Sequence, residues 1–160
     1  MRGEATLAWT LGVALIAAAC GGGGESAGQR EATARAAKAD SVKMAEEIYD
    51  PAAFDTIAWE SDQARLERGQ VVWQFSCQKC HGLDGQGNGE LARQAGLDVP
   101  SFRAPDWQYD GDVPAIRHRI FVGHEGAMPN WGLHGLKYRD IDAVAAYVNE
   151  VIRGHAAAVR

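Results

Sequence analysis

The chain has 160 residues, of which 46% are hydrophobic and 23% charged, and its 21 acidic and 16 basic side chains give a net charge of -5. This length suits one domain with additional segments, and the ordinary charged fraction argues against a polytopic membrane protein. The acidic balance disfavours a general nucleic-acid binder, which needs a basic face to displace counterions, so we expect no nucleic-acid partner.

The first 19 residues have the features of an export signal. Arg2 precedes an apolar run over residues 7–19, which is shorter than the ~20 residues that a membrane-spanning helix needs. Three alanines then precede Cys20, and four glycines follow it. This pattern resembles the lipobox of bacterial lipoproteins, in which the cysteine is acylated and becomes the first mature residue. We therefore expect removal of residues 1–19 and a lipid on Cys20 that holds the chain at the periplasmic face of a membrane. An ordinary cleaved signal and an uncleaved anchor are the alternatives.

Residues 20–60 are expected to form a tether between the lipid and the folded domain. Residues 21–30 are rich in glycine and polar side chains, a composition typical of flexible linkers. Residues 31–48 are rich in good helix formers and carry a thin apolar stripe at helical spacing. This pattern predicts a marginal helix, and a solvated, partly disordered segment is the alternative.

Residues 61–157 are expected to form one compact all-α domain. The expected helices begin near Ser61 and continue through Trp73, cover residues 90–95 and 113–122, and run from Asp140 to a stop at Gly154. The last helix has the clearest pattern, because its apolar residues recur at i, i+3, i+4 and i+7. No alternating strand segment of useful length is visible. A domain this short, with few apolar residues, would gain stability from a large apolar cofactor in its core.

The motif that carries chemistry is Cys77-Gln78-Lys79-Cys80-His81, which has the C-x-x-C-H pattern of c-type haem attachment. Two cysteines three apart at a helix end can each add across one vinyl group of the porphyrin, and the histidine then supplies an axial imidazole to the iron. A thioredoxin-type disulfide would need a βαβ context, and a structural zinc site would need a second pair of ligands. A purely structural disulfide does not explain His81.

With this motif the chain resembles the class I monohaem c-type cytochromes, from about residue 63 to residue 154. The resemblance rests on Arg68-Gly69, Trp73, Cys77 to Gly82, Gly85 to Gly89, Gly126 to Gly132 and Ala145 to Val148. It implies the class I cytochrome c fold, a small helical domain wrapped around one covalently bound haem c. It also implies that an N-terminal helix crosses the C-terminal helix at Gly69, with Trp73 and Tyr147 filling the contact.

Met128 is the candidate for the second axial ligand of the iron. It is the only one of the three methionines that lies in the expected domain after the haem motif. Pro129 biases it toward an extended backbone and glycines surround it, so we expect it on a loop that can reach the iron face opposite His81. The alternatives are a gap-filling core methionine and His124 as the ligand in place of Met128.

Several other residues are expected to shape the pocket. Phe102, Trp107, Tyr109, Phe121 and Trp131 are candidates for packing on the porphyrin, though aromatic residues there also suit an ordinary core. Arg103 is a candidate partner for a haem propionate, with a solvated surface arginine as the alternative. The resemblance also implies a prolyl carbonyl that accepts the proton of the ligating imidazole, for which Pro100 is the candidate.

An iron with both axial positions filled cycles between Fe(III) and Fe(II) with little rearrangement, which is typical of electron transfer and not of an oxidase or peroxidase. We therefore expect a membrane-anchored electron carrier, itself not an enzyme. Its redox partners would be a quinol-oxidising complex and a terminal oxidase, reductase or photosynthetic reaction centre. A fixed haem subunit of a larger respiratory complex is the main alternative. A haem-based sensor or enzyme, in which Met128 is displaced, is the third hypothesis.

Overall fold

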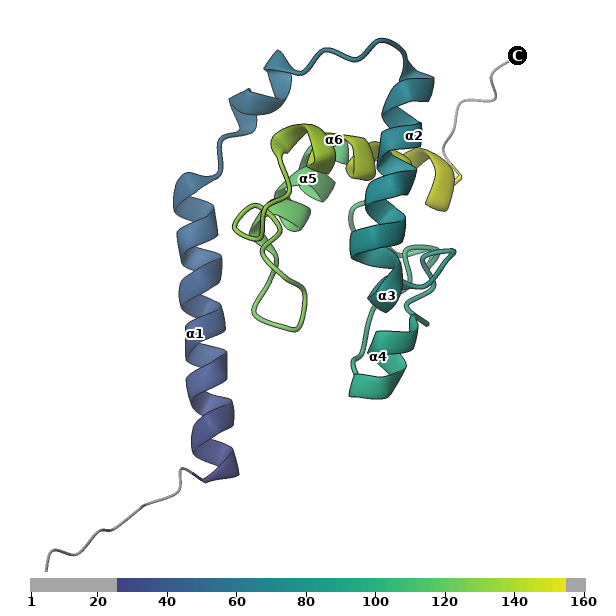
Figure 1. Cartoon of the computed structure of the whole chain (residues 1–160). Helices are drawn as coiled ribbons and strands as arrows, with labels where there is room; N and C mark the ends of the chain where they lie inside the picture. The colour runs from purple at the N-terminus through teal and green to yellow at the C-terminus, as the bar shows by residue number, and fades with distance from the viewer. Residues whose placement is uncertain (1–25, 155–160) are drawn as a thin grey trace, which may run out of the picture.

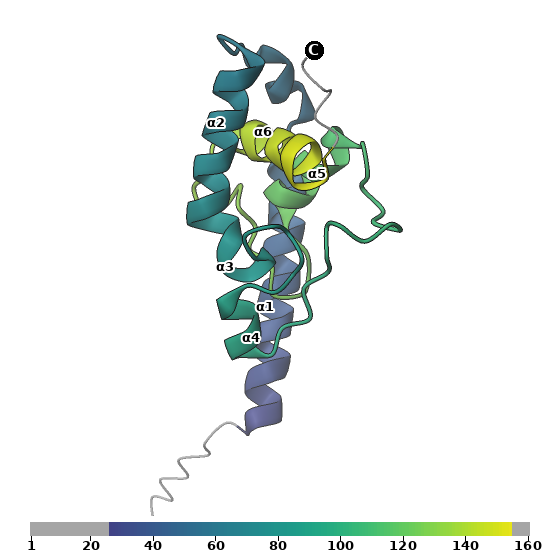
Figure 2. The ribbon, with the colours of Figure 1, turned by 90° about the vertical axis from the view of Figure 1, so that its right-hand side faces the viewer.

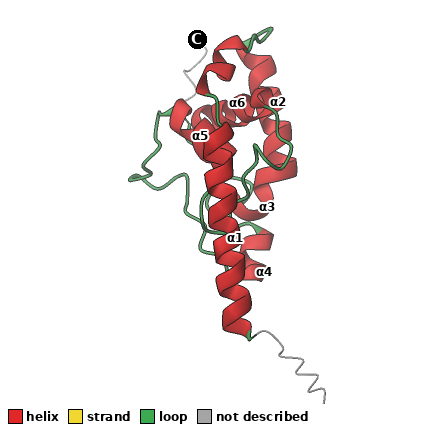
Figure 3. Cartoon of the chain, turned by 90° about the vertical axis from the view of Figure 1, so that its left-hand side faces the viewer, coloured by secondary structure: helices red, strands yellow, loops and turns green. Residues whose placement is uncertain are grey.

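The computed structural model describes residues 26–154, whose regular elements are all helical (Figure 1 and Figure 3). They are α1 (Ala27–Ile48), η1 (Pro51–Thr56), α2 (Asp62–Val72), η2 (Trp73–Cys77), α3 (Gln78–His81), α4 (Glu90–Ala95), α5 (Val113–Val122), α6 (Tyr138–Tyr147) and η3 (Val148–Ile152). The described range contains no strand, which confirms the all-α class. The expected signal peptide and Cys20 lie outside the described residues. No helix between residues 26 and 154 is both long and apolar enough to cross a membrane.

Local sequence signals account for most of the helix ends. Helix α2 begins after Ser61, whose hydroxyl accepts a hydrogen bond from the backbone N–H of Ala64, as an N-cap residue does. Asp112 caps α5 in the same way. Helix α6 begins slightly before the expected Asp140, at Tyr138, and its helical path continues through η3. The helices expected over residues 90–95 and 113–122 are confirmed.

Helices α2, η2 and α3 form one continuous rod, and α6 crosses it near its upper end (Figure 2). Gly69 lies at the crossing, where an added Cβ would come within 2.7 Å of the Cβ of Tyr147 and closer still to the carbonyl oxygen of Ala143. Trp73 is only 1% exposed, and its ring centroid lies 6.2 Å from that of Tyr147. The expected crossing is therefore confirmed, and it sets where the rod delivers its C-terminal end.

Asp142 of α6 is a buried carboxylate that joins three parts of the fold. It accepts hydrogen bonds from Arg65 of α2 at 2.9 Å and from the indole N–H of Trp59 at 2.7 Å, and it also pairs with Arg117 of α5. A buried carboxylate is tolerated only when its charge and its oxygen atoms are satisfied, and two guanidinium groups do this here. Helices α2 and α5 are thereby fastened to the same point of α6.

The residues expected to form a tether pack against the domain over much of their length. The helix expected over residues 31–48 is present as the longer helix α1. Its first part, residues 27–37, is exposed, whereas Ala45 is fully buried. Phe54 of η1 is also buried, in the same hydrophobic core as the helices that follow. The core therefore begins before the boundary expected at Ser61, because α1 docks through polar contacts as well as through its thin apolar stripe.

Candidate functional site

A cavity of about 770 Å³ lies between the end of the α2–α3 rod and the loop that follows α5. This volume is in the range of ~300–1,000 Å³ that is usual for cofactor pockets. The lining includes all four residues expected to hold a haem, namely Cys77, Cys80, His81 and Met128. In the sequence these residues form a short motif and a distant loop position, and the fold brings them to one cavity.

The two cysteines of the motif lie where η2 passes into α3. They are free thiols and form no disulfide with each other. Burial, together with the neighbouring Cys80, raises the pKa of the Cys77 thiol to about 12, so this group stays protonated. The surroundings of this sulfur atom therefore favour an uncharged form. A thioether bond to a porphyrin vinyl group suits them, because a thioether has no ionisable proton.

The glycine-rich run after the motif folds back against the end of α3. The backbone N–H of Gly87 donates to the carbonyl of His81 at 2.8 Å, and that of Gly89 donates to the carbonyl of Cys80 at 3.1 Å. A Cβ on Gly89 would come within 2.6 Å of the Cys80 carbonyl group, so only glycine permits this approach. These bonds satisfy carbonyl groups that the end of a helix would otherwise leave unpaired. The run thus holds the haem motif in place.

His81 is held by aromatic stacking. Its ring centroid lies 4.5 Å from that of Phe102, with 26° between the ring planes. Its Nδ1 atom is buried without a hydrogen-bond partner. Pro100, the expected acceptor of the imidazole proton, lines the cavity but makes no such bond. Burial, and secondarily the nearby His124, lower the pKa of His81 to about 4. The imidazole is therefore neutral near pH 7, which is the form that binds a metal.

Met128 lies on the loop between α5 and α6, as expected, and is partly buried. Its backbone carbonyl accepts a 2.7 Å hydrogen bond from Nζ of Lys38 in α1. His124, the alternative axial ligand, lies on the same loop and also lines the cavity. Its Nδ1 atom accepts a hydrogen bond from the backbone N–H of Gly126 at 3.0 Å, so one of its two ring nitrogens is already used within the loop.

Most of the expected aromatic residues reach the cavity. Its lining includes Phe102, Trp107, Tyr109 and Trp131. Phe121 lies elsewhere, in the hydrophobic core under α1, where its ring packs 5.2 Å from that of Tyr49. Arg103 also lies outside the lining, and its Nε atom donates to the carbonyl of Asp84 at 2.9 Å. The structure therefore gives Arg103 a backbone partner in place of the expected propionate.

The sequence offered no signal for the residues that fasten the cavity loops. Arg153 is nearly buried, donates to the carbonyls of Phe102 and Ala104, and pairs with Asp110 at 2.7 Å. It thereby holds the loop that carries the aromatic lining. Lys38 does the same for the Met128 loop, and burial lowers the pKa of its ammonium group. Both depend on contacts between distant parts of the chain, which no local pattern reveals.

The residues present fit a haem c. Two free thiols and a neutral imidazole come from one short helical segment, and a thioether comes from a facing loop, all on one cavity. The buried Nδ1 atom without a partner belongs to the same imidazole that would bind the iron. Aromatic side chains around these groups offer an apolar surface to a porphyrin.

Comparison with known proteins agrees with this chemistry. Residues 64–148 match the model of the family described as cytochrome c oxidase, cbb3-type, subunit III. The match includes the haem motif, the Met128 loop and the helix crossing, whereas α1 lies outside it. No solved structure matches the chain at a significant level.

Individual relatives fall into two groups. The cbb3-type cytochrome c oxidase subunit CcoP of Rhodobacter capsulatus is 31% identical over an alignment of 122 residues that covers 68% of this chain and 39% of the relative. The subunit FixP of Azorhizobium caulinodans is 33% identical over 88 residues, covering 55% of this chain and 28% of the relative. Cytochrome c-554(547) of Halothiobacillus neapolitanus is 27% identical over 81 residues, covering 50% of this chain and 89% of the relative. The chain thus spans about two-fifths or less of these oxidase subunits. Because the family model covers more than half of it, the chain belongs to the cytochrome c oxidase, cbb3-type, subunit III family and is a c-type cytochrome.

Proposed function

We propose that the chain binds one haem, attached covalently through Cys77 and Cys80, with His81 and Met128 as the axial ligands of its iron. The observation that carries this proposal is the lining of a single cavity by all four side chains. Bound in this way, the haem would supply a one-electron Fe(III)/Fe(II) couple. His/Met ligation raises the potential of that couple relative to ligation by two histidines.

The protein's own contribution is to hold the ligands and to keep water away. Gly87 and Gly89 fix the end of α3 that carries His81, and the stacked ring of Phe102 orients the imidazole. The aromatic lining lowers the local dielectric constant and limits solvent access. With both axial positions filled, this chain transfers electrons and does not itself activate oxygen.

The location of the chain and its electron partners are the second part of the proposal. We propose that residues 1–19 direct export, that Cys20 is acylated, and that the domain works at the periplasmic face of a membrane. There it would pass electrons between a quinol-oxidising complex and a terminal oxidase, reductase or reaction centre. The net charge of -5 favours a basic docking surface on such a partner.

A fixed subunit of a respiratory oxidase is the second candidate. The names of the CcoP and FixP relatives favour it, since both are subunits of cbb3-type oxidases. The match to cytochrome c-554(547) covers 89% of that relative, whose name mentions no larger complex, and this favours the carrier. Extraction of native membranes with a mild detergent separates the two, because a mobile carrier leaves alone and a fixed subunit co-purifies with oxidase activity. A Cys20→Ser variant cannot be acylated, so it should carry no fatty acid while its haem stays intact, and this tests the lipid anchor.

The electronic spectrum of the oxidised protein tests the ligands. Methionine ligation gives a low-spin spectrum with a sulfur-to-iron charge-transfer band at the red edge of the visible range. A sensor or enzyme with a displaceable Met128 would instead bind carbon monoxide readily in the reduced state. A high-spin ferric spectrum, with rapid carbon monoxide binding, would refute the carrier and support that third hypothesis.

A further inference from the structure

The second half of the Met128 loop is fastened by one buried side chain. Asn130 is 1% exposed, and its amide nitrogen donates to the carbonyl of Val122 at the end of α5. The backbone N–H of Trp131 then donates to the carbonyl of Ile120 at 3.2 Å, which continues the same attachment. The loop is therefore tied to α5 just after Met128. Met128 precedes these attached residues. Among the hydrogen bonds of the described residues, none joins the backbone of Met128 to α5.

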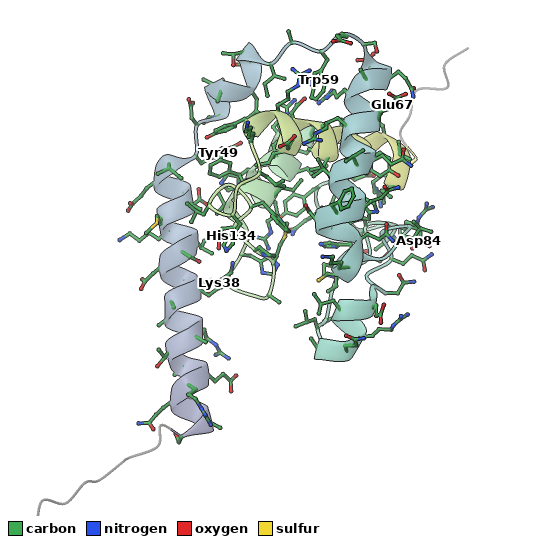
Figure 4. All side chains as sticks on the ribbon, viewed as in Figure 1. Lys38, Tyr49, Trp59, Glu67, Asp84 and His134 are labelled. Atoms are coloured by element: carbon green, nitrogen blue, oxygen red, sulfur yellow. The ribbon has the colours of Figure 1, made fainter. Side chains whose placement is uncertain are left out.

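The side chain that completes the attachment comes from α1. Nζ of Lys38 donates to the backbone carbonyl of Met128 and to Oδ1 of Asn130, each at 2.7 Å (Figure 4). The hydroxyl oxygen of Ser41, one turn further along α1, lies 3.0 Å from the same Oδ1 atom. Hydrogen bonds from an ammonium group are about twice as strong as neutral ones. One cation thus bridges the candidate ligand's own backbone and the residue that anchors its loop.

Lys38 is the first residue of α1 that is partly buried, and its ammonium group bonds to the Met128 loop. Residues 27–37 of α1 are exposed, so Lys38 is where the helix first meets the domain. The partly buried ammonium takes part in none of the ion pairs formed within the described range, and its two acceptors both belong to the loop. Helix α1 also lies outside the region that matches the family, residues 64–148. The attachment therefore comes from a segment that precedes the matched region of the haem domain.

We propose that Lys38 is a positioning residue that holds the Met128 loop over the cavity and so keeps the methionine on the iron. The inference rests on the proposed ligation by Met128. Without Lys38, the carbonyl of Met128 and the amide of Asn130 lose charge-assisted bonds, and the loop opens more often. Loss of a positive charge beside the site also favours the ferric state over the ferrous state, so the reduction potential falls.

The opening of the loop can be measured with imidazole, which binds ferric iron only when the methionine has left. The apparent Kd of imidazole equals its intrinsic Kd divided by the fraction of open molecules. Loss of a hydrogen bond to a charged group predicts that Lys38→Met lowers this apparent Kd by about tenfold or more. The sulfur-to-iron charge-transfer band of Lys38→Met should also weaken on heating, at temperatures where unchanged far-ultraviolet circular dichroism shows that the helices remain folded. The full-length, haem-loaded protein is used throughout.

Three further variants make the test specific. Lys43→Met is the matched control, because Lys43 is an exposed lysine of the same helix and the substitution removes the same charge. It should leave the apparent Kd of imidazole within about twofold of wild type. Lys38→Arg keeps the charge and the donors and should restore most of the wild-type value. Ser41→Ala removes the hydroxyl group that lies 3.0 Å from Oδ1 of Asn130 and that also donates to the carbonyl of Lys38 at 2.7 Å, and it should lower the apparent Kd by about threefold. It serves as the test if Lys38→Met does not fold.

The outcomes separate this inference from the function on which it rests. If the wild-type band is present and Met128→Ala abolishes it, the proposed ligation stands. An apparent Kd in Lys38→Met within twofold of wild type, or a fall equally large in Lys43→Met, then overturns the role of Lys38. A natively folded Ser41→Ala with unchanged imidazole binding overturns it as well. If wild type lacks the band and binds imidazole as tightly as Met128→Ala, the ligation by Met128 is itself wrong, and the positioning role is refuted with it.

Discussion

The two walls of the haem cavity are built in different ways. The wall with Cys77, Cys80 and His81 comes from one continuous rod, and the bonds that hold it join neighbours in sequence, such as Gly89 to Cys80 and Gly87 to His81. The wall with Met128 is a loop held from outside, by a lysine 90 residues earlier in the chain. One wall is therefore fixed locally, and the other depends on how distant helices pack.

This difference assigns separate tasks to the two walls. The rod carries the thiols and the imidazole, so under the proposed ligation it would decide whether haem is attached at all. The loop carries the thioether, so it would decide the reduction potential and how easily another ligand reaches the iron. Changes to the rod should act on haem retention, whereas changes to the loop should act on potential and ligand exchange with the haem still attached.

The largest expected effect is on the rod. Replacing Cys77 and Cys80 together by alanine removes both thioether bonds, so no haem should remain on the chain after denaturing electrophoresis with haem staining. Single replacements should keep one bond and reduce the stained band. A double variant that still stains would contradict the assignment of this wall.

Met128→Ala is the corresponding change in the loop and should give the opposite pattern. Its covalent haem should be retained in full, while the charge-transfer band disappears and the reduction potential falls, because a thioether ligand stabilises ferrous iron. A redox titration beside haem staining measures both properties. An unchanged potential would exclude Met128 as a ligand and remove the distinction between the walls.

Asp142→Asn tests the buried network behind both walls, because Asp142 binds Arg65 of α2, which leads into the rod wall, and Arg117 of α5, which precedes the Met128 loop. Removing one partner of a buried ion pair leaves uncompensated charge, so the free energy of unfolding should fall by about 3 kcal/mol. Denaturant unfolding measures this loss. Asp55→Asn, at an exposed position of η1, is the control and should change stability by less than about 0.5 kcal/mol. Equal effects of the two would contradict the role of the buried network.

Gly69→Ala should have a smaller effect, confined to the rod. The added methyl group meets Ala143 and Tyr147 of α6, and overpacking of this kind costs about 2 kcal/mol of unfolding free energy. Gly28→Ala in α1 is the matched control, since nothing lies within 4 Å of its added Cβ, and there the better helix propensity of alanine should leave stability unchanged or slightly raised. A stable Gly69→Ala variant would show that α2 and α6 do not pack as closely as described.

The sequence predicts the locally determined features well. The C-x-x-C-H motif identified the rod wall, and capping residues such as Ser61 and Asp112 marked helix starts. The helix crossing at Gly69 was expected from the resemblance to the class I cytochromes c, whose glycine position this residue matches. Each of these signals is contained in a short stretch of chain. The lining of the cavity by Met128 could be expected because a single methionine follows the motif in the domain.

Features that depend on distant contacts were not predictable in this way. Nothing in the local sequence distinguishes Lys38 from Lys43, yet one reaches the Met128 loop and the other is exposed. The apolar stripe of α1 looked too thin for docking, because the polar bonds of Lys38 and Ser41 do not appear in a hydrophobic pattern. Phe121 and Arg103 were expected at the haem from their residue types alone. In the structure Phe121 packs against Tyr49 at the end of α1, and Arg103 donates a hydrogen bond to the backbone carbonyl of Asp84.

The central claim is that one cavity holds one haem, attached at Cys77 and Cys80. The most direct test is mass spectrometry of a protease digest of the mature protein, produced in a host that exports and matures c-type cytochromes. We expect the peptide carrying both cysteines to bear the mass of one haem, linked at each sulfur. The same peptide recovered with free thiols, or with a disulfide between the two cysteines, would contradict this claim.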